Sequence, residues 1–188
     1  NPIDNTENRT IAFDGTNDFI PIGSLGSFYT QGTISFWMKS LDITANYRNP
    51  FSTNYNGSLN VNVLRFEQGE GAGAFKCWFG DPSGTIASLS YSSISANTWY
   101  HVGAVYDRTD KLTLYINGSF DSATTITQFI ANDFQASHIF RIGSYSDASN
   151  NAAYFLNGFI PQLQIYNRVL SATEIQQNYN ATKGRFGL

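Results

Sequence analysis

The stretch TWYHVGAVYDRTDKLTLYINGS, residues 98–119, contains two strands and two turns in unbroken succession. From Trp99 to Tyr106, and again from Lys111 to Ile116, the side chains fall into two alternating sets, with the period of two that a pleated strand imposes. Polar residues 107–110 form the first turn. The pair Asn117-Gly118 tolerates positive φ at both positions and predicts a type I′ hairpin. We therefore expect a three-stranded meander that continues to about residue 125.

The rest of the chain repeats short strands between turn residues, which predicts an antiparallel sandwich rather than a parallel α/β sheet. Ser171-Ala-Thr-Glu174 has the spacing of a capping box, so one helix is expected at 172–181, ending near Lys183-Gly184. Strands at 10–14 and 18–22 are expected to form a first hairpin at a sandwich edge. Further strands are expected at 33–40, 59–67, 74–80, 84–90, 138–143 and 155–167.

Charge and composition limit the partners. The 188-residue chain carries a net charge of −3 with Lys and Arg scattered singly, so no nucleic-acid partner is expected. Its apolar runs are too short for membrane insertion. The single cysteine, Cys77, allows no intrachain disulfide and lies in an apolar context typical of a buried side chain. We expect residues 1–9 to be a lead-in or linker and residues 10–188 to form one domain.

Several motifs carry a resemblance to a known family. LNGFIPQLQIYNRVLSATEI at 156–175 resembles the family's closing signature, and FDGTNDFI at 13–20 and TISFWM at 33–38 extend the likeness over residues 10–182. The chain resembles the laminin-G-like domains of the concanavalin A-like lectin/glucanase superfamily. This resemblance implies an all-β fold, an antiparallel two-sheet β-sandwich of jelly-roll type with one short C-terminal helix.

The resemblance also implies a function, because such modules usually bind glycans or proteins without catalysis. The tail NYNATKGRFGL, residues 178–188, is similar to laminin-G-like modules of bacteriophage structural proteins. We therefore expect a lectin-like module for a glycan or host surface receptor, on a virion or at an extracellular or cell surface. The alternative is a structural capsid or tail decoration module that contacts other virion or cell-surface protein chains and has no glycan ligand.

Enzymatic activity is not expected. Glucanases of the superfamily use two carboxylates in an E-x-D-x-E arrangement, and this chain lacks it. The two histidines, His101 and His138, lie in or beside expected strands without a Cys or carboxylate at ligand spacing, so neither a zinc site nor a catalytic triad is indicated. The glutamates are Glu7, Glu67, Glu70 and Glu174.

A calcium site is a candidate at the first turn. Asp14, Asn17 and Asp18 place three hard oxygen ligands within five residues, whereas Ca²⁺ takes 6 to 8 oxygens. In related domains the remaining ligands come from a late G-x-I-D-E strand, and the positions that match its D-E pair here are Pro161 and Gln162. The resemblance thus implies Asp14, Asn17, Asp18 and Gln162 as a metal set. The other reading is that both aspartates hydrogen-bond their own turn.

Glycan binding would use aromatic rings that stack on a pyranose and polar groups that satisfy its hydroxyls. Two polar loops offer such mixtures, and Tyr145 is expected to be exposed in the second of them. In the core, Trp99 is expected to be largely buried, and Trp37 to face a second layer. The candidate ligand residues are Tyr47, Tyr55 and Asn56 in the first loop, and Tyr145, Asp147, Asn150 and Tyr154 in the second.

Overall fold

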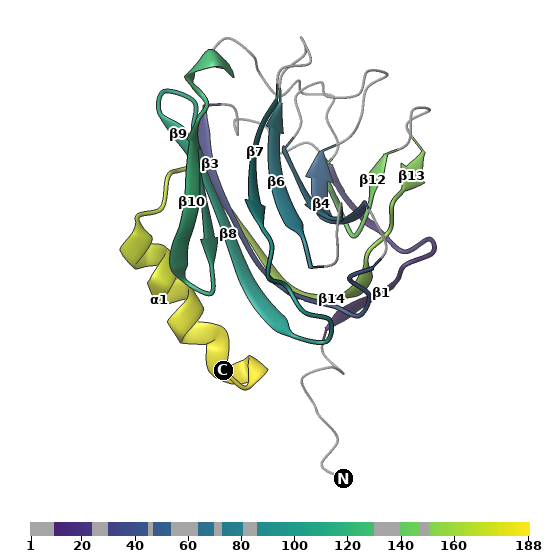
Figure 1. The fold of residues 1–188 in the computed structure, drawn as a ribbon. Coiled ribbons are helices and arrows are strands. Elements are labelled where there is room, and N and C mark those ends of the chain that lie inside the picture. The colour runs from purple at the N-terminus through teal and green to yellow at the C-terminus, as the bar shows by residue number, and fades with distance from the viewer. Residues whose placement is uncertain are drawn as a thin grey trace.

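The computed structural model describes residues 10–23, 30–44, 47–53, 64–69, 73–80, 86–129, 140–146 and 151–188. Within these residues the chain forms two antiparallel six-stranded sheets packed face to face, with one short helix at the C-terminal end (Figure 1). This arrangement confirms the expected jelly-roll sandwich. No helix in the described ranges is long and apolar enough to cross a lipid bilayer.

The strands of each sheet come from distant parts of the chain. Sheet A has the order β1 (Ile11–Asp14), β14 (Asn157–Tyr166), β3 (Gln31–Ser40), β8 (Trp99–Asp107), β9 (Lys111–Ile116) and β10 (Ser119–Thr125). Sheet B has the order β2 (Ile20–Gly23), β11 (Phe140–Ile142), β4 (Arg48–Thr53), β5 (Leu64–Gln68), β6 (Phe75–Gly80) and β7 (Ile86–Tyr91). A small ribbon pairs β12 (Tyr145–Ser146) with β13 (Ala152–Ala153).

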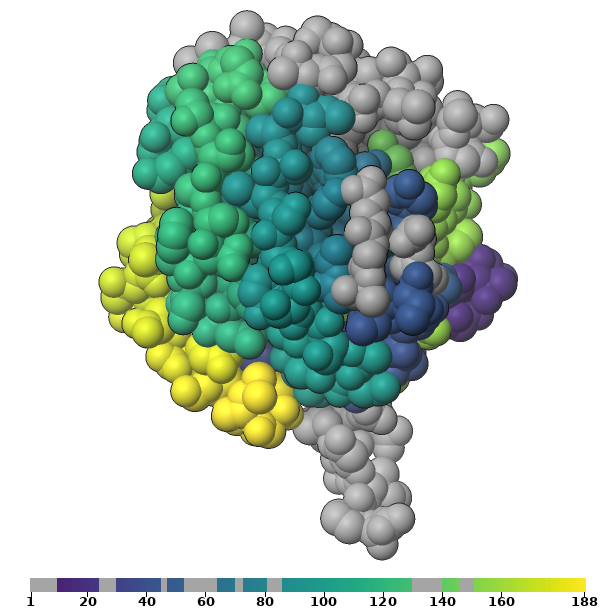
Figure 2. Space-filling view, viewed as in Figure 1, coloured from purple at the N-terminus to yellow at the C-terminus, as the bar shows by residue number. Residues whose placement is uncertain are grey.

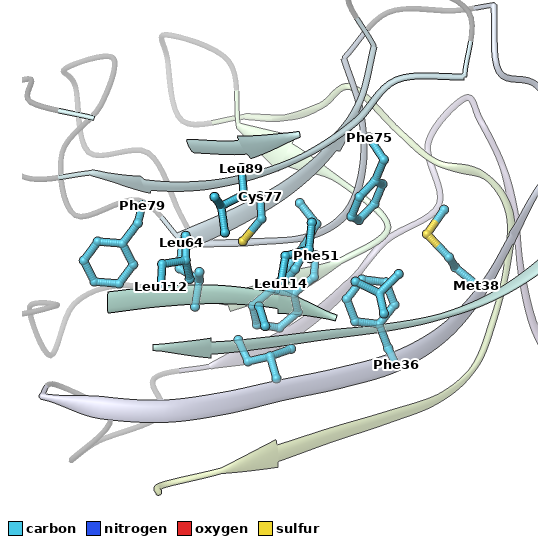
Figure 3. Packing of buried hydrophobic residues seen from close by; sticks show 14 of the residues in the cluster. Phe36, Met38, Phe51, Leu64, Phe75, Cys77, Phe79, Leu89, Leu112 and Leu114 are labelled. Atoms are coloured by element: carbon cyan, nitrogen blue, oxygen red, sulfur yellow. The ribbon is translucent and has the colours of Figure 1, made fainter. Parts of the chain in front are cut away.

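The core lies between the inner faces of the two sheets, where aromatic and aliphatic side chains meet (Figure 3). Phe36 of sheet A packs edge-on against Phe66 of sheet B, with 4.9 Å between the ring centroids. Cys77 is fully buried there, and burial raises the pKa of its thiol. Its predicted role as a small buried hydrophobe is confirmed.

The central meander has the predicted form. Strands β8, β9 and β10 follow one another in sheet A, and Asn117 and Gly118 have φ of 51° and 76°. Gly118 has a second constraint, since a Cβ there would lie 2.9 Å from Tyr179 of the helix. The Asn117 side chain also accepts a hydrogen bond from the His101 N–H at 2.9 Å, which ties the turn to β8.

The prediction that the strands at 10–14 and 18–22 form a hairpin is wrong. Strand β1 pairs with β14 at one edge of sheet A, whereas β2 pairs with β11 at one edge of sheet B. The turn at residues 14–18 therefore carries the chain from one sheet to the other. Alternation identified both strands, but pairing partners lie more than a hundred residues away and leave no local signal.

The outer face of sheet A is covered by helix α1 (Ala172–Thr182) and a 3₁₀ turn (Lys183–Phe186). The predicted capping box is present, since the Glu174 N–H donates to Ser171 Oγ and the Ser171 N–H donates to Glu174 Oε2. Ile175 is the fully buried anchor of the helix. Figure 2 shows this C-terminal segment, in yellow, against the green strands at the edge of sheet A.

Trp37 and Trp99 differ from one another in burial. Trp37 is 1% exposed, stacks on Phe186 with 4.2 Å between centroids, and donates from Nε1 to Thr182 Oγ1 at 2.9 Å. Its predicted contact with a second layer is confirmed. Trp99 is less completely buried than Trp37, but most of it is covered, which agrees with the expectation that it is largely buried. Its ring lies on the outer face of sheet A, where Phe186, Phe159 and the Lys39 ammonium pack against it.

His101 lies beneath the helix on the same face. It is 1% exposed, its Nε2 lies 2.8 Å from Ser35 Oγ, and its ring packs beside Trp37 and Tyr179. Burial lowers the pKa of the imidazole to about 4. The neutral ring is therefore the form that the folded protein accommodates.

Replacing Trp37 by Ala should lower the free energy of unfolding by about 3–5 kcal/mol, because a fully buried ring leaves a cavity. Trp99→Ala should cost about 1–2 kcal/mol, because part of that ring is already in water. Urea unfolding of both variants measures the difference. Equal shifts would contradict the assignment of Trp37 as the anchor of the outer layer.

Acidification should destabilise the fold through His101. The pKa of the ring is lower in the folded than in the unfolded chain, so its contribution is complete above about pH 6.5 and is lost as pH falls toward 4. The loss is on the order of 3 kcal/mol. Urea unfolding at pH 7 and pH 4 measures it, with His101→Gln as the non-titrating control. An unchanged pH dependence in that variant would rule out His101 as the source.

Candidate functional site

Two exposed tyrosines meet at one rim of the sandwich. Tyr47 precedes β4, and Tyr154 follows β13, which pairs with β12 beside β4 (Figure 1). The two residues are 43% and 46% exposed, and their ring centroids are 5.9 Å apart at an angle of 69°. We call these two residues the tyrosine pair. Two open ring faces set at an angle form a surface on which a flat apolar group can stack.

The backbone of both tyrosines is unusual. Tyr47 has φ of 65° and Tyr154 has φ of 56°, in the left-handed region that disfavours residues with a Cβ. Among the described non-glycine residues, the others with positive φ are Asn97 and Asn117, and asparagine adopts this conformation readily. Strained backbone in bulky residues tends to mark functional sites.

Asn49 holds both tyrosines in this conformation. Its backbone N–H donates to the carbonyl of Tyr154 at 3.1 Å, and its side-chain Nδ2 donates to the carbonyl of Tyr47 at 2.6 Å. Asn49 itself is 1% exposed. A single buried residue, through its backbone N–H and its side-chain amide, thus holds the backbone of both exposed tyrosines.

Beneath the pair lies a layer of aromatic and charged side chains. Tyr145 is 3% exposed, with its ring centroid 6.3 Å from that of Tyr154. The Arg65 guanidinium lies 4.8 Å from the ring of Tyr145 and 4.8 Å from that of Trp78, and it pairs with Glu67 at 3.0 Å. The expected exposure of Tyr145 is wrong, because the arginine covers it. Tyr145 supports Tyr154 from below.

Arg65, Trp78 and Lys76 were not among the predicted site residues. All three point away from the core on the outer face of sheet B, and the Lys76 ammonium lies 5.2 Å from the Trp78 ring. The alternation in Phe75–Phe79 was a usable signal, because it places Lys76 and Trp78 together on the face opposite the buried side chains. The contact of Arg65 with Tyr145 brings in a distant part of the chain and has no local signal.

The remaining predicted ligand residues cannot be placed. Of the seven, the structure brings Tyr47, Tyr145 and Tyr154 together. The other four, Tyr55, Asn56, Asp147 and Asn150, lie outside the described residues.

The predicted calcium ligands Asp14, Asn17 and Asp18 share one turn. Asp14 Oδ1 accepts hydrogen bonds from the Thr16 N–H at 2.7 Å and the Asn17 N–H at 3.3 Å, and Asp18 Oδ2 accepts one from the Asp14 N–H at 3.1 Å. The carboxylates therefore cap the backbone of their own turn, as the alternative reading of the sequence expected.

Gln162 does not belong to this group. Asp14 pairs with Asn157 on β14, whereas Gln162 pairs with Trp37 further along the same strand. At about 3.3 Å per residue, roughly 16 Å of strand separate Gln162 from the level of Asp14. Its expected place beside Asp14 is wrong. Within the described ranges no cluster of three or more His, Cys, Asp or Glu side chains is placed to bind a metal ion.

The described acidic and basic groups are engaged in structural contacts. Glu174 caps α1, and its hydrogen bond from Arg168 lowers the pKa of its carboxyl to about 2. Glu67 is buried, and the Ser35–His101 pair is closed off beneath the helix. A cavity of about 140 Å³ beside the helix, lined by residues that include Arg168 and Glu174, is smaller than the roughly 300 Å³ of an ordinary ligand pocket. Glu7, Glu70 and His138 lie outside the described residues.

The known proteins to which this chain is similar include toxins and a pentraxin. Paraclostridial mosquitocidal protein 1 of Paraclostridium bifermentans is 25% identical over 165 residues, which are 82% of this chain but 13% of that protein. The crystal structure of its binding domain matches with a TM-score of 0.67 at 20% identity, over 92% of this chain and 43% of that one.

Two further solved structures share the fold. The ligand binding domain of botulinum neurotoxin serotype D, in complex with N-acetylneuraminic acid, has a TM-score of 0.66 at 17% identity, over 92% of this chain and 41% of that one. The heptameric SAP-like pentraxin from Limulus polyphemus has a TM-score of 0.68 at 20% identity, over 89% and 79%.

A laminin-G model described as the concanavalin A-like lectin/glucanases superfamily matches residues 14–176. This range includes every strand from β2 to β14 and the start of α1. The chain therefore belongs to the concanavalin A-like lectin/glucanases superfamily.

Proposed function

We propose that this chain is a non-catalytic, lectin-like module that binds a glycan of a surface receptor through the tyrosine pair. The observation that carries the proposal is that two bulky, exposed tyrosines adopt left-handed backbone and face one another. Such strain persists only where the surroundings enforce it, and here Asn49 does so. An exposed aromatic corner with an amphipathic rim suits the C–H-rich face of a pyranose.

The charges around the pair favour a neutral sugar. Arg65 is already paired with Glu67, and Arg48, next to Tyr47, lies 3.6 Å from Asp42. A carboxylate on the ligand would have to compete with these existing partners. The relative that was crystallised with N-acetylneuraminic acid is 17% identical and lends its fold alone. We therefore propose a neutral hexose or N-acetylhexosamine residue as the stacked unit.

The setting of the module is part of the proposal. The relatives named above include binding domains of toxins, which supports an extracellular or cell-surface role. The chain spans 13% of the curated toxin that it matches, so that protein's activity is not carried over. A place on a virion, and the alternative of an assembly module acting by protein contact, stay predictions from the sequence.

Glycan binding should depend on both tyrosines. On an array of neutral and sialylated glycans, we expect binding to neutral structures. Tyr47→Ala or Tyr154→Ala should weaken it about tenfold, because a stacked ring contributes about 1–1.5 kcal/mol. Calorimetry measures the affinity. Phe120→Ala is the matched control, since Phe120 is the most exposed of the described aromatic rings, at 63%, and lies on β10.

Three outcomes would count against this function. Variants that bind like the wild type would remove the tyrosine pair from the site. Binding restricted to sialylated glycans would overturn the ligand class. An absence of binding to every glycan would favour the assembly module.

The strain at Tyr47 should be visible in stability. Tyr47→Gly should be more stable than Tyr47→Ala by about 1 kcal/mol, because glycine adopts positive φ without a Cβ clash. Both variants lose the ring, so both should lose glycan affinity alike. Urea unfolding compares the two proteins. An alanine variant as stable as the glycine variant would show that the backbone at Tyr47 carries no strain.

A further inference from the structure

An arginine, Arg48, lies at the rim of the sandwich that carries the tyrosine pair. Arg48 begins β4, between the strained Tyr47 and the buried Asn49. Its Nη1 donates to the carbonyl of Gly15 at 2.7 Å and to the carbonyl of Phe155 at 2.7 Å. Its Nη2 lies 3.6 Å from the Asp42 carboxylate, and the side chain is 20% exposed. One guanidinium therefore contacts three separate loops.

Each of these loops belongs to a different part of the rim. Gly15 lies in the turn between β1 and β2, Phe155 follows Tyr154 of the tyrosine pair, and Asp42 follows β3. Asp42 is itself held in place, since its carboxylate accepts from Thr44 and its carbonyl accepts from Ser40 Oγ. Arg48 thus joins segments that are 33 and 107 residues away in sequence.

The oxygens of this rim do not fit a calcium ion. Ca²⁺ needs 6 to 8 oxygen ligands at about 2.3–2.6 Å. The carbonyl of Gly15 already accepts from Arg48, and the carboxylates of Asp14 and Asp18 already accept from backbone N–H groups of their own turn. Gln162 lies far along β14. A divalent ion at this turn would also meet the positive guanidinium.

The packing around Arg48 leaves little room for another ion. Gly15 has φ of 79°, and a Cβ built there would lie 2.8 Å from Arg48 Nη1. The turn is therefore shaped so that its carbonyl reaches the guanidinium directly. Arginine keeps its charge at all ordinary pH values and presents a rigid fork of donors.

We propose that the Arg48 guanidinium takes the place of a bound metal ion at this rim. It is a built-in cation that cross-links the three loops and positions the tyrosine pair, so the fold keeps this rim without calcium. The part that concerns ligand binding rests on the proposed function. The part that concerns calcium and rim order does not.

The test compares Arg48→Met, which removes the cation, with Arg168→Met as a control. Arg168 is also an ion-paired arginine, but it is 53% exposed and lies beside α1. Wild-type protein should unfold at the same temperature in EDTA and in millimolar CaCl₂, and calorimetric titration with CaCl₂ should show no binding. Arg48→Met should lower the midpoint by about 5–10 °C in both buffers, against about 2 °C or less for the control.

A local readout separates cross-linking from general destabilisation. Amide hydrogen exchange should accelerate at residues 14–18 and 151–157 in Arg48→Met, while the central strands at 99–116 keep their protection. Arg48→Lys keeps the positive charge but loses the planar guanidinium with its several N–H donors, so it should show the same pattern of faster exchange to a smaller degree. If Arg48→Met fails to fold, the lysine variant carries the test.

Opposite results would overturn the inference. One is a calcium-dependent rise in the wild-type midpoint that Asp14→Asn abolishes. Another is an effect of Arg48→Met no larger than that of Arg168→Met, or exchange that rises evenly over the chain. Loss of glycan binding in the tyrosine variants does not enter these measurements. A failure of the proposed function and a failure of this inference are therefore distinguishable.

Discussion

The stacking of Phe186 on Trp37 closes the outer face of sheet A, and the burial of the central strand β3 depends on it. With the helix and the C-terminal turn in place, β3 is buried on both of its faces, from Gly32 to Ser40. Sheet A then has an inner face against sheet B and an outer face against α1. In the described part of the chain, the exposed aromatic pair lies elsewhere, at the rim of sheet B. The C-terminal layer thus covers the outer face of sheet A and leaves the exposed aromatic pair, the proposed binding surface, away from α1.

At that rim, three consecutive residues have three different structural roles. Tyr47 presents its ring to solvent, Arg48 joins three loops through its guanidinium, and Asn49 holds the carbonyls of both tyrosines. The three residues can take these different roles because they lie at the start of β4, where the strand enters the sheet. Residues at the start of β4 still have backbone groups free for contacts outside the ladder, because the register with β5 is irregular between Arg48 and Phe51. An irregular strand end can therefore hold together loops that regular pairing could not reach.

Much of the fold could be predicted from local pattern. The meander around Asn117-Gly118 and the capping box at Ser171 both rest on neighbours in sequence, and both are confirmed. Alternation also showed which residues share a face. It could not show what covers that face, so Tyr145 was expected to be exposed although Arg65 covers its ring, and that expectation was wrong. The tyrosine residues themselves were predicted, but their left-handed backbone was not, because no glycine or asparagine marks either position.

The same backbone explains why tyrosine at these two positions points to function. Left-handed geometry would be met without strain by glycine, and with little strain by asparagine, as Asn97 and Asn117 show elsewhere in the described chain. A tyrosine there adds strain, and a ring that stays more than 40% exposed recovers only part of that cost by packing on its aromatic neighbours. Stability alone therefore does not account for two tyrosines in contact at these sites. The proposed glycan binding gives the two exposed rings a role that stability does not supply. The rigid support from Asn49 then means that a ligand meets the rings already in position, so little ordering is needed on association.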